Sequence, residues 1–474
     1  MTSAIVVGSG PNGLAAAARL ARAGLEVTVL EAADMIGGGT RSEELIVPGL
    51  IHDQCSAFHP IAARSPFLAE LDLAAHGLRW LQPEVDCVHP LDDGSAGVFL
   101  KSVDQTADAM GDDGERWRRL FGPMSAKLDA LLADATQPVL GVPRHPLTLA
   151  RFGAAAVLPA TVLARWWQTE QARALWAGVA AHALYRLDRP MTSAVGLMLV
   201  AAGHGEGWVV AEGGSQAIAD ALAAEIRHHG GTIETGQRVM SAADLPAHDV
   251  LLLDVAPSAA VGILGDRLPA HVARAYRRYR HGAGAFKVDF AIEGEVPWTA
   301  EPARRAGTVH LGGDSREVFG NELAVHRGIL PERPFVLVGQ QFLADPTRSV
   351  GTTNPLWSYA HVPHGFRGDA TDAIVGQIER FAPGFRERIL GMAVRSTTEM
   401  SMLNANYVGG DIIGGASSPT QLLFRPRFAR DPYSTGIPGV YLCSASTPPG
   451  AGAHGMSGAN AAARALATLD DPGR

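Results

Sequence analysis

The first 31 residues constrain the fold more than any other segment, because they predict a strand, a glycine-rich turn, a helix and a second strand in succession. Residues 4–7 form a short apolar run that suits a parallel strand buried on both faces. Residues 14–23 are rich in Ala and Leu, which is typical of a helix, and residues 25–30 alternate as a second strand. We therefore predict a strand–helix–strand unit whose first turn is GSGPNG, residues 8–13.

The glycines of this turn predict a nucleotide site. Gly8 permits the tight turn, Gly10 lets the backbone approach a diphosphate, and Gly13 lets the helix pack closely on the strand. The helix N-terminus also presents unpaired N–H groups to phosphate. Glu31 follows the second strand, where its carboxylate can accept hydrogen bonds from ribose hydroxyls. A ligand-free glycine turn is the alternative, and the combination of features argues against it.

A second glycine cluster favours FAD over NAD as the cofactor. Residues 37–39 are all glycine, and Thr40 and Arg41 follow them directly. A glycine cluster and an arginine so soon after Glu31 suit a longer ligand, which threads deeper into the protein. Arg41 would offer phosphate a planar and permanently charged partner. Its alternative is a surface arginine that pairs with Glu43 or Glu44.

Composition excludes several classes of function and location. The 474 residues suggest two or three domains, or one large enzyme with an inserted domain. The net charge of −8 argues against nucleic-acid binding, and three scattered cysteines without a CxxC pattern support no metal site and no redox disulfide. We expect no signal peptide, and the apolar stretches 152–164 and 191–202 fall short of a membrane span. We expect a cytoplasmic protein, with peripheral contact at a membrane as the alternative.

Periodicity predicts further elements along the chain. Helices are expected over residues 111–132, 159–187, 213–230 and 459–469. Strands are expected over 232–235, 250–253, 282–292, 335–340 and 439–443.

Three motifs resemble one family of flavoproteins. They are the opening glycine turn, the segment GGGTRSEEL (residues 37–45) and the segment YLCSASTPPGAGAHGMSGANAA (residues 441–462). Together they resemble the phytoene desaturase-like FAD-dependent oxidoreductases of the amine oxidase-like superfamily. Internal segments such as residues 281–298 and 404–415 are most similar to the pyridine nucleotide-disulfide oxidoreductase domain 2-like branch. The disulfide in that branch name does not suit this chain, which has neither a redox cysteine pair nor a second dinucleotide motif.

The resemblance implies an α/β fold, with a doubly wound Rossmann-type FAD-binding domain and an inserted α+β substrate domain. The FAD-binding domain is then built from residues 1–101, 204–285 and 421–474. The substrate domain is built from residues 102–203, which are mostly helical, and residues 286–420. FAD is expected to be held without a covalent bond.

The resemblance also assigns cofactor neighbours. In the C-terminal turn, helix N–H groups near residues 456–457 would face the flavin edge. Val239 matches the position whose backbone faces the adenine. Asp254 departs from the Ala-Thr-Gly of many relatives, which leaves the backbone geometry beside the diphosphate open. The full set is Gly8, Ser9, Gly10, Pro11, Asn12, Gly13, Glu31, Ala32, Gly38, Gly39, Thr40, Arg41, Val239, Gly450, Gly452, His454, Gly455 and Met456.

The activity implied is dehydrogenation (desaturation) of an apolar, isoprenoid- or lipid-like substrate by hydride transfer to flavin N5. A C–N oxidase that acts on amines and a flavoprotein with an interaction role are the alternatives. The electron acceptor is open between oxygen, a quinone and another carrier, and the oligomeric state is also open. A helix rich in tryptophan, residues 163–185, suits either the core or a wall of an apolar tunnel.

The second hydrogen leaves as a proton, and several side chains could accept it. The candidates for catalysis are His454, His59 and Lys287. Lys287 shares a strand face with Asp289, so an internal ion pair is its alternative. Because the chain has 17 histidines, a structural role is the usual alternative for each, including the further candidates His204, His310 and His361.

Overall fold

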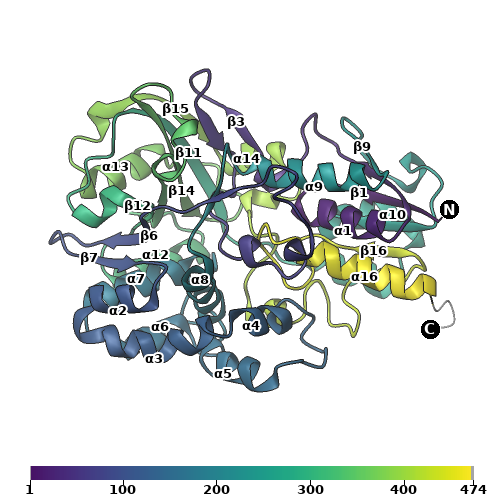
Figure 1. Ribbon diagram of the computed structural model, residues 1–474, viewed down its shortest axis with the longest axis horizontal. Helices are drawn as coiled ribbons and strands as arrows, with labels where there is room; N and C mark the ends of the chain where they lie inside the picture. The colour runs from purple at the N-terminus through teal and green to yellow at the C-terminus, as the bar shows by residue number, and fades with distance from the viewer. Residues whose placement is uncertain (1, 471–474) are drawn as a thin grey trace.

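The computed structural model describes residues 2–470 as two sheets with helices packed around them (Figure 1). The first sheet is fully parallel, in the order β16-β10-β1-β2-β9. Its strands are β1 (Ser3–Val7), β2 (Glu26–Leu30), β9 (Thr232–Glu234), β10 (Val250–Leu253) and β16 (Val440–Leu442). The chain runs outward from β1 in both directions, which makes this a doubly wound sheet with its switch point between β1 and β10. The predicted α/β fold class is confirmed.

Helices cover both faces of the parallel sheet. On one face, α1 (Pro11–Arg22) packs against α9 (Gln216–His228) and α16 (Met456–Asp470) around an alanine-rich core. On the other face, α10 (Pro257–Leu264) and α11 (Ala270–Arg277) pack against the side chains of β1, β10 and β16. The loops that follow β1 and β10 therefore lie side by side at the carboxyl ends of the parallel strands, between these two helical layers.

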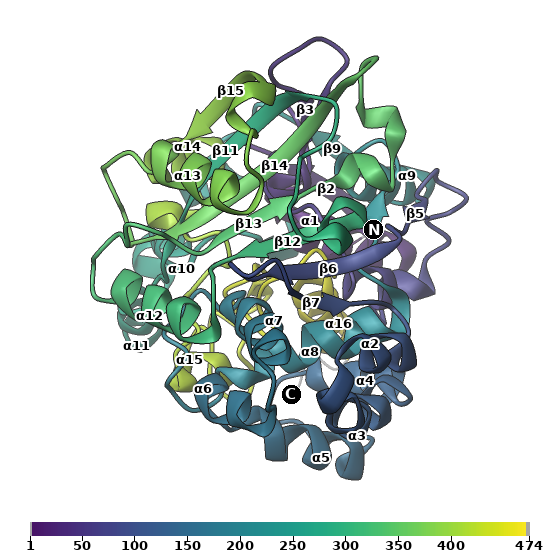
Figure 2. The ribbon, with the colours of Figure 1, turned by 90° about the vertical axis from the view of Figure 1, so that its left-hand side faces the viewer.

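The second sheet has seven strands in the order β15-β11-β14-β13-β12-β6-β7. The β6–β12 pair is parallel and the other pairs are antiparallel. One face packs against α13 (Thr371–Phe381), and the other carries a layer of helices that includes α12 (Ser315–His326), as Figure 2 shows. The strands are β6 (Val85–Pro90), β7 (Ala96–Phe99), β11 (Gly284–Glu293), β12 (Ala306–Leu311), β13 (Val336–Gly339), β14 (Thr353–Val362) and β15 (Ile389–Arg395).

In the helical layer, two segments that periodicity predicts as continuous helices are each interrupted. Residues 111–132 form α3 and α4, and residues 159–187 contain α6 and α7, separated by extended backbone at Trp167. The Asp113 carboxylate produces this break by accepting hydrogen bonds from the backbone N–H groups of Gln168 (2.8 Å) and Thr169 (2.7 Å). Trp167 and Trp176 are fully buried in this layer. Its helices are α2 (Val103–Ala109), α3 (Gly114–Ser125), α4 (Leu128–Ala135), α5 (Pro146–Ala156), α6 (Ala160–Leu163), α7 (Glu170–Ala181) and α8 (Ser193–Glu206).

Short elements join the two sheets. The pairs β3 (Ser42–Glu44) with β4 (Ile51–Asp53), and β5 (Trp80–Leu81) with β8 (Val210–Ala211), are two-stranded. The helices α14 (Thr397–Leu403) and α15 (Pro419–Leu423) lie in the segment that returns to β16. Within residues 2–470, no single helix is long and apolar enough to cross a bilayer; α5 and the helical segment that ends at Trp166 meet the criterion together, but with a bend of 87° between them.

Candidate functional site

A cleft lies at the switch point of the parallel sheet. Gly8 follows β1 and Asp254 follows β10, so the turns after the two strands face each other across this cleft. Its volume is about 140 Å³, and its walls come from residues 10–12, from Gly39 and Thr40, and from residues 444–446 and 451–453. It therefore connects the opening glycine turn with the C-terminal bend. Ligands of doubly wound sheets bind in this position, outside the carboxyl ends of the strands.

The glycines of the first turn are required by close backbone contacts. Gly8 has a φ of 98°, which side chains rarely adopt. A Cβ atom at Gly13 would lie 2.1 Å from the carbonyl oxygen of Gly8. The second glycine cluster packs against the first, since a Cβ at Gly38 would lie 2.9 Å from the Cα of Gly10. The two clusters that the sequence separates by a helix and a strand thus form one surface.

Glu31 follows β2, and its carboxylate binds the opening glycine turn. Its Oε2 accepts hydrogen bonds from Ser9 N (2.9 Å) and Ser9 Oγ (2.5 Å). Its Oε1 accepts from Ala33 N (2.8 Å) and from Arg41 Nη2 (3.2 Å). Arg41 is therefore a buried partner of Glu31 and not a surface partner of Glu43, which pairs with Arg395.

Unpartnered polar atoms around the cleft fit a polar ligand such as FAD. Asn12 Oδ1 and Arg41 Nε are buried and have no hydrogen-bond partner within the described chain. Buried polar atoms almost always have one. Residues 10–13 and Arg41 would hold the diphosphate and ribose region, with Glu31 beside them. Ala32 is exposed next to Glu31, and the Glu31 carbonyl accepts from Gln237 N (2.7 Å), which brings the segment of Val239 to the same end.

The Asp254 carboxylate binds a backbone N–H group at the N-terminus of helix α1, which would face the diphosphate. Its Oδ2 accepts a hydrogen bond from Gly13 N (2.9 Å), and a Cβ at Gly10 would lie 2.7 Å from the same oxygen. Burial raises the pKa of Asp254 to about 7, against the hydrogen bond from Gly13, and the charge of Glu31 adds to the rise. The sequence marks this residue as a departure, and the structure places it in contact with the nucleotide turn.

We expect the affinity for FAD to fall as the pH rises through 7, because an ionised Asp254 repels the diphosphate. If FAD binds only the protonated form, the Kd should rise up to about 30-fold between pH 6 and pH 8.5. The variant Asp254→Asn should show almost no change over this range. Quenching of FAD fluorescence during titration measures each Kd.

Asp249→Asn is the matched control for this titration, because Asp249 lies just before β10 and binds Ser3 at the opposite end of the strand. This variant should keep the wild-type pH dependence. If Asp254→Asn kept it too, the ionisation of Asp254 would not be its source.

The C-terminal bend closes the other end of the cleft. Gly450, Gly452 and Gly455 all have positive φ, and a Cβ at Gly455 would lie 2.6 Å from the Cβ of Ala15 on α1. Helix α16 begins at Met456, which agrees with the helix start expected near residues 456–457 and lies ahead of the Ala-rich helix predicted over residues 459–469. The bend is thus held against α1 and presents its backbone to the cleft.

His454 and His59 line a larger cavity, and both are neutral near pH 7. Met456 N donates to His454 Nδ1 (3.1 Å), so His454 Nε2 donates to Ala451 O (3.1 Å) and both ring nitrogens are engaged. His59 Nε2 lies 2.8 Å from Ser215 Oγ, and no hydrogen bond of its Nδ1 occurs within the described residues. Burial lowers the pKa of each histidine to about 4. Their catalytic roles stay predictions.

The remaining candidates have internal partners. Lys287 forms a buried ion pair with Asp289 and lines neither cavity. His204 accepts from Trp117 Nε1 (2.8 Å), and His361 pairs with Glu322 (2.6 Å). His310 on β12 contacts His182 at the end of α7 (3.0 Å), between the sheet and the helical layer. These contacts are internal to the protein, and catalytic roles for these side chains stay untested predictions.

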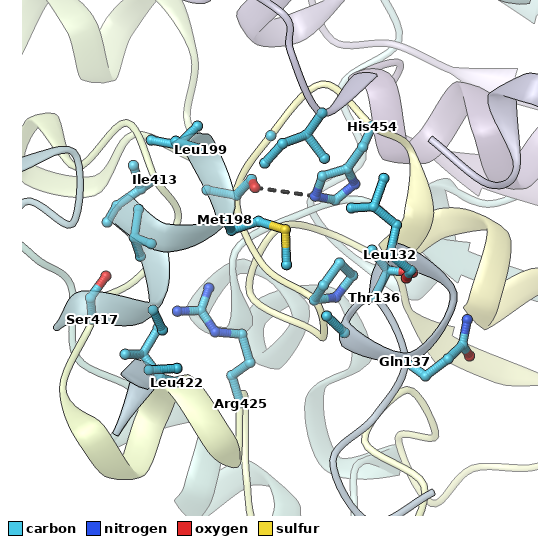
Figure 3. A pocket seen from close by; sticks show the side chains of 18 of the residues that line it. Leu132, Thr136, Gln137, Met198, Leu199, Ile413, Ser417, Leu422, Arg425 and His454 are labelled. Atoms are coloured by element: carbon cyan, nitrogen blue, oxygen red, sulfur yellow. Dashed lines mark hydrogen bonds between the residues drawn. The ribbon is translucent and has the colours of Figure 1, made fainter. Parts of the chain in front are cut away.

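The larger cavity has a volume of about 1550 Å³ and shares residues 451–453 with the cleft. Figure 3 shows side chains that line it, among them Met198, Arg425 and His454. Sequence reasoning missed most of its walls, which come from α4, α5, α8 and the segments 137–144 and 412–432. The apolar lining includes Leu132, Leu149, Phe152, Met198, Leu199, Trp357, Ile412 and Leu422. The charged lining consists of Asp134, Arg144, Arg425, Arg430, Asp431 and Arg464.

Comparisons with known proteins agree with this architecture. Residues 6–70 match the NAD(P)-binding Rossmann-like domain. A solved structure of putrescine oxidase bound to putrescine has a similar fold, with a TM-score of 0.61, 18% identity, and 98% of this chain and 99% of that chain covered. The chain therefore contains a Rossmann-like nucleotide-binding unit within a fold similar to that of putrescine oxidase, and the residues of its cleft fit FAD.

Two curated proteins are similar to this chain in sequence. Pyridine nucleotide-disulfide oxidoreductase domain-containing protein 2 of Rattus norvegicus is 24% identical, with 97% of this chain and 92% of that protein covered. One of the polypeptides of limonene dehydrogenase from Castellaniella defragrans is 31% identical over 136 residues, which cover 28% of this chain and 24% of that protein. The predicted resemblance to the first protein's branch is confirmed.

The three cysteines of the chain are free and buried.

Proposed function

We propose that this protein dehydrogenates a C–C bond of an apolar, isoprenoid- or lipid-like substrate. The observation that carries the proposal is the cavity of about 1550 Å³ with its apolar lining, which meets the nucleotide cleft at the C-terminal bend. Bound FAD supplies the hydride acceptor, its N5 atom. The partial similarity to limonene dehydrogenase supports a substrate of this class.

The cavity walls would orient the substrate and exclude water. The side chains of Met198, Leu199 and Ile412 present hydrocarbon to the space beside the bend. Burial lowers the pKa of His59 to about 4, so its side chain is neutral near pH 7 and places no charge in the apolar cavity. When His59 Nε2 donates to Ser215 Oγ, Nδ1 keeps a lone pair that can accept the substrate's proton. We therefore assign the base to His59 in preference to His454, whose two nitrogens are engaged.

The fold similarity to putrescine oxidase keeps amine oxidation as the second candidate. An ammonium substrate needs an available carboxylate in the cavity. Asp134 already accepts from Arg144 N (2.8 Å) and His145 N (2.7 Å), and Asp431 pairs with Arg464 (3.1 Å). Four arginines against two aspartates line the walls, which disfavours a cation.

Anaerobic bleaching of the flavin absorbance tests the proposal. We expect at least one of the apolar donors limonene, squalene and oleate to bleach the flavin and to yield a product with one more double bond, whereas putrescine and cyclohexylamine should not. The variant His59→Gln should slow bleaching about 100-fold or more, because proton removal loses its acceptor. His271→Gln, on the exposed side of α11, is the control and should bleach at the wild-type rate.

Bleaching by amines alone, with release of an aldehyde or ketone, would instead assign C–N oxidation. If no donor of either class bleached the flavin, the redox proposal would fail in favour of a structural or interaction role for the cofactor.

A further inference from the structure

One buried arginine faces the large cavity without a carboxylate partner. Arg425 follows α15, is 3% exposed and lines the cavity. Its Nε donates to Gln421 O (3.3 Å) and its Nη1 donates to Ala445 O (3.0 Å). Within residues 2–470, no carboxylate oxygen lies within 4.0 Å of the guanidinium nitrogens; the ion pairs of the described chain do not include Arg425.

The nearby acids are committed to other groups. Asp411 accepts from Gly282 N (2.8 Å) and Ile413 N (3.0 Å) and pairs with His281. Asp431 pairs with Arg464, and Asp134 binds two backbone N–H groups. A buried guanidinium without an anion is costly, and arginine cannot lose its charge. The cavity therefore contains a cation whose partner is not supplied by the described protein.

The guanidinium lies beside the C-terminal bend. A Cβ atom at Gly450 would be 2.7 Å from Arg425 Nη1. Figure 3 shows the guanidinium and the His454 ring facing the same space, with Met198 between them. Of its five N–H donors, two are used by the carbonyls of Gln421 and Ala445, so Nη2 and the second hydrogen of Nη1 are available. These donors form an edge that suits two oxygens of one anion.

We propose that this cavity binds an amphipathic molecule whose acidic head group, a carboxylate or a phosphate, pairs with Arg425. The apolar body would lie along Leu132, Phe152 and Met198. This inference rests on the proposed function and narrows it: the substrate is an acid with a long apolar chain, and not a neutral hydrocarbon or an amine. By holding the head group, Arg425 would determine which C–C bond of the substrate lies beside the C-terminal bend, where dehydrogenation is proposed.

Isothermal titration calorimetry of the FAD-loaded protein tests the inference with four probes of equal chain length: dodecanoate, dodecyl phosphate, dodecan-1-ol and dodecylamine. We expect at least one of the two anions to bind with a Kd at least about ten-fold below that of the alcohol, and the amine to bind no better than the alcohol. The comparison of the two anions distinguishes a carboxylate from a phosphate ligand. This series needs no variant.

Variants then locate the preference. Arg425→Met should bring the anion and alcohol Kd values within about two-fold, and Arg425→Lys should keep part of the difference because it keeps the charge. Arg430→Met is the matched control, since Arg430 lines the same cavity but is exposed, and it should keep the wild-type preference. Melting temperature and flavin content check that each variant folds.

Three results would overturn the inference: equal binding of anions and alcohol by the wild-type protein, an anion preference that persists in Arg425→Met, or its loss in Arg430→Met. The proposed function fails separately. An anion preference without bleaching by any lipid keeps this inference and removes dehydrogenation, whereas bleaching by hydrocarbons without an anion preference does the reverse.

Discussion

Replacing Gly13 by alanine should abolish FAD binding and lower the free energy of unfolding by about 3 kcal/mol or more. The added Cβ would lie 2.1 Å from Gly8 O and 3.0 Å from Asp254 Oδ2. Gly8 O belongs to the backbone of the turn, so it cannot move aside as a flexible side chain would. The turn between β1 and α1 would have to open, and the N–H groups at the start of α1 would leave the cleft. Flavin content after purification and the urea midpoint measure the two effects.

Gly262→Ala is the matched control in a helix that packs on the same parallel sheet. Gly262 is an exposed residue inside α10, and a Cβ there would meet no atom within 4 Å. This variant should be more stable than wild type by up to about 1 kcal/mol, since alanine is the better helix former, and it should keep its flavin. A folded Gly13→Ala protein that retains wild-type FAD affinity would show that the diphosphate does not lie over this turn.

The first unit of the fold could be predicted closely because its signals are local. Strand β2 begins one residue after the predicted start, and helix α1 begins at Pro11, three residues before the predicted one. The earlier start follows from chemistry that the sequence contains, because proline suits the first helical position. Strand β10 has the predicted bounds, and α16 begins at Met456, ahead of the Ala-rich segment 459–469. Glycine, proline and apolar runs suffice for these elements.

The contacts between distant segments could not be predicted in the same way. Asp254 reaches Gly13 across 241 positions of sequence, only because β1 and β10 pair in parallel. The cavity walls combine α4 and α8 with the segment after α15, and nothing local in the sequence around Arg425 marks it as buried. The sequence could not distinguish the histidines either. His59 and His204 are both buried, and only their partners differ, because His204 is engaged through both ring nitrogens and His59 through Nε2.

Removal of the buried cation Arg348 should destabilise the protein by about 3–5 kcal/mol at pH 7. Arg348 is 1% exposed and donates to Asp53 Oδ2 from Nη1 (2.6 Å), to Asp345 Oδ2 from Nε (3.0 Å) and to Ala211 O from Nη2 (2.7 Å). These bonds join β4 and β8 to the segment that precedes β14. Arg348→Met preserves much of the side-chain volume and leaves two buried carboxylates without their cation. Urea unfolding at pH 7 measures the loss.

The loss should shrink as the pH falls, and this dependence separates charge from packing. Burial alone would raise the pKa of Asp53, but Arg348 and the hydrogen bonds from Ser215 and Ser42 hold it below its ordinary value. In the wild-type protein this carboxylate therefore stabilises the fold above about pH 4, and the stabilisation is lost as the pH falls through its lowered pKa. Without Arg348 the burial is less opposed and the pKa of Asp53 rises, so protonation relieves the variant on acidification. The difference between wild type and variant should be clearly smaller at pH 4.5 than at pH 7.

Arg305→Met, which removes an exposed partner of Glu84 and Glu301, is the control and should leave the urea midpoint almost unchanged at both pH values. An equal loss for Arg348→Met at pH 7 and pH 4.5 would mean that the arginine stabilises the contacts of β4 and β8 with the segment before β14 by packing, and that its charge contributes little.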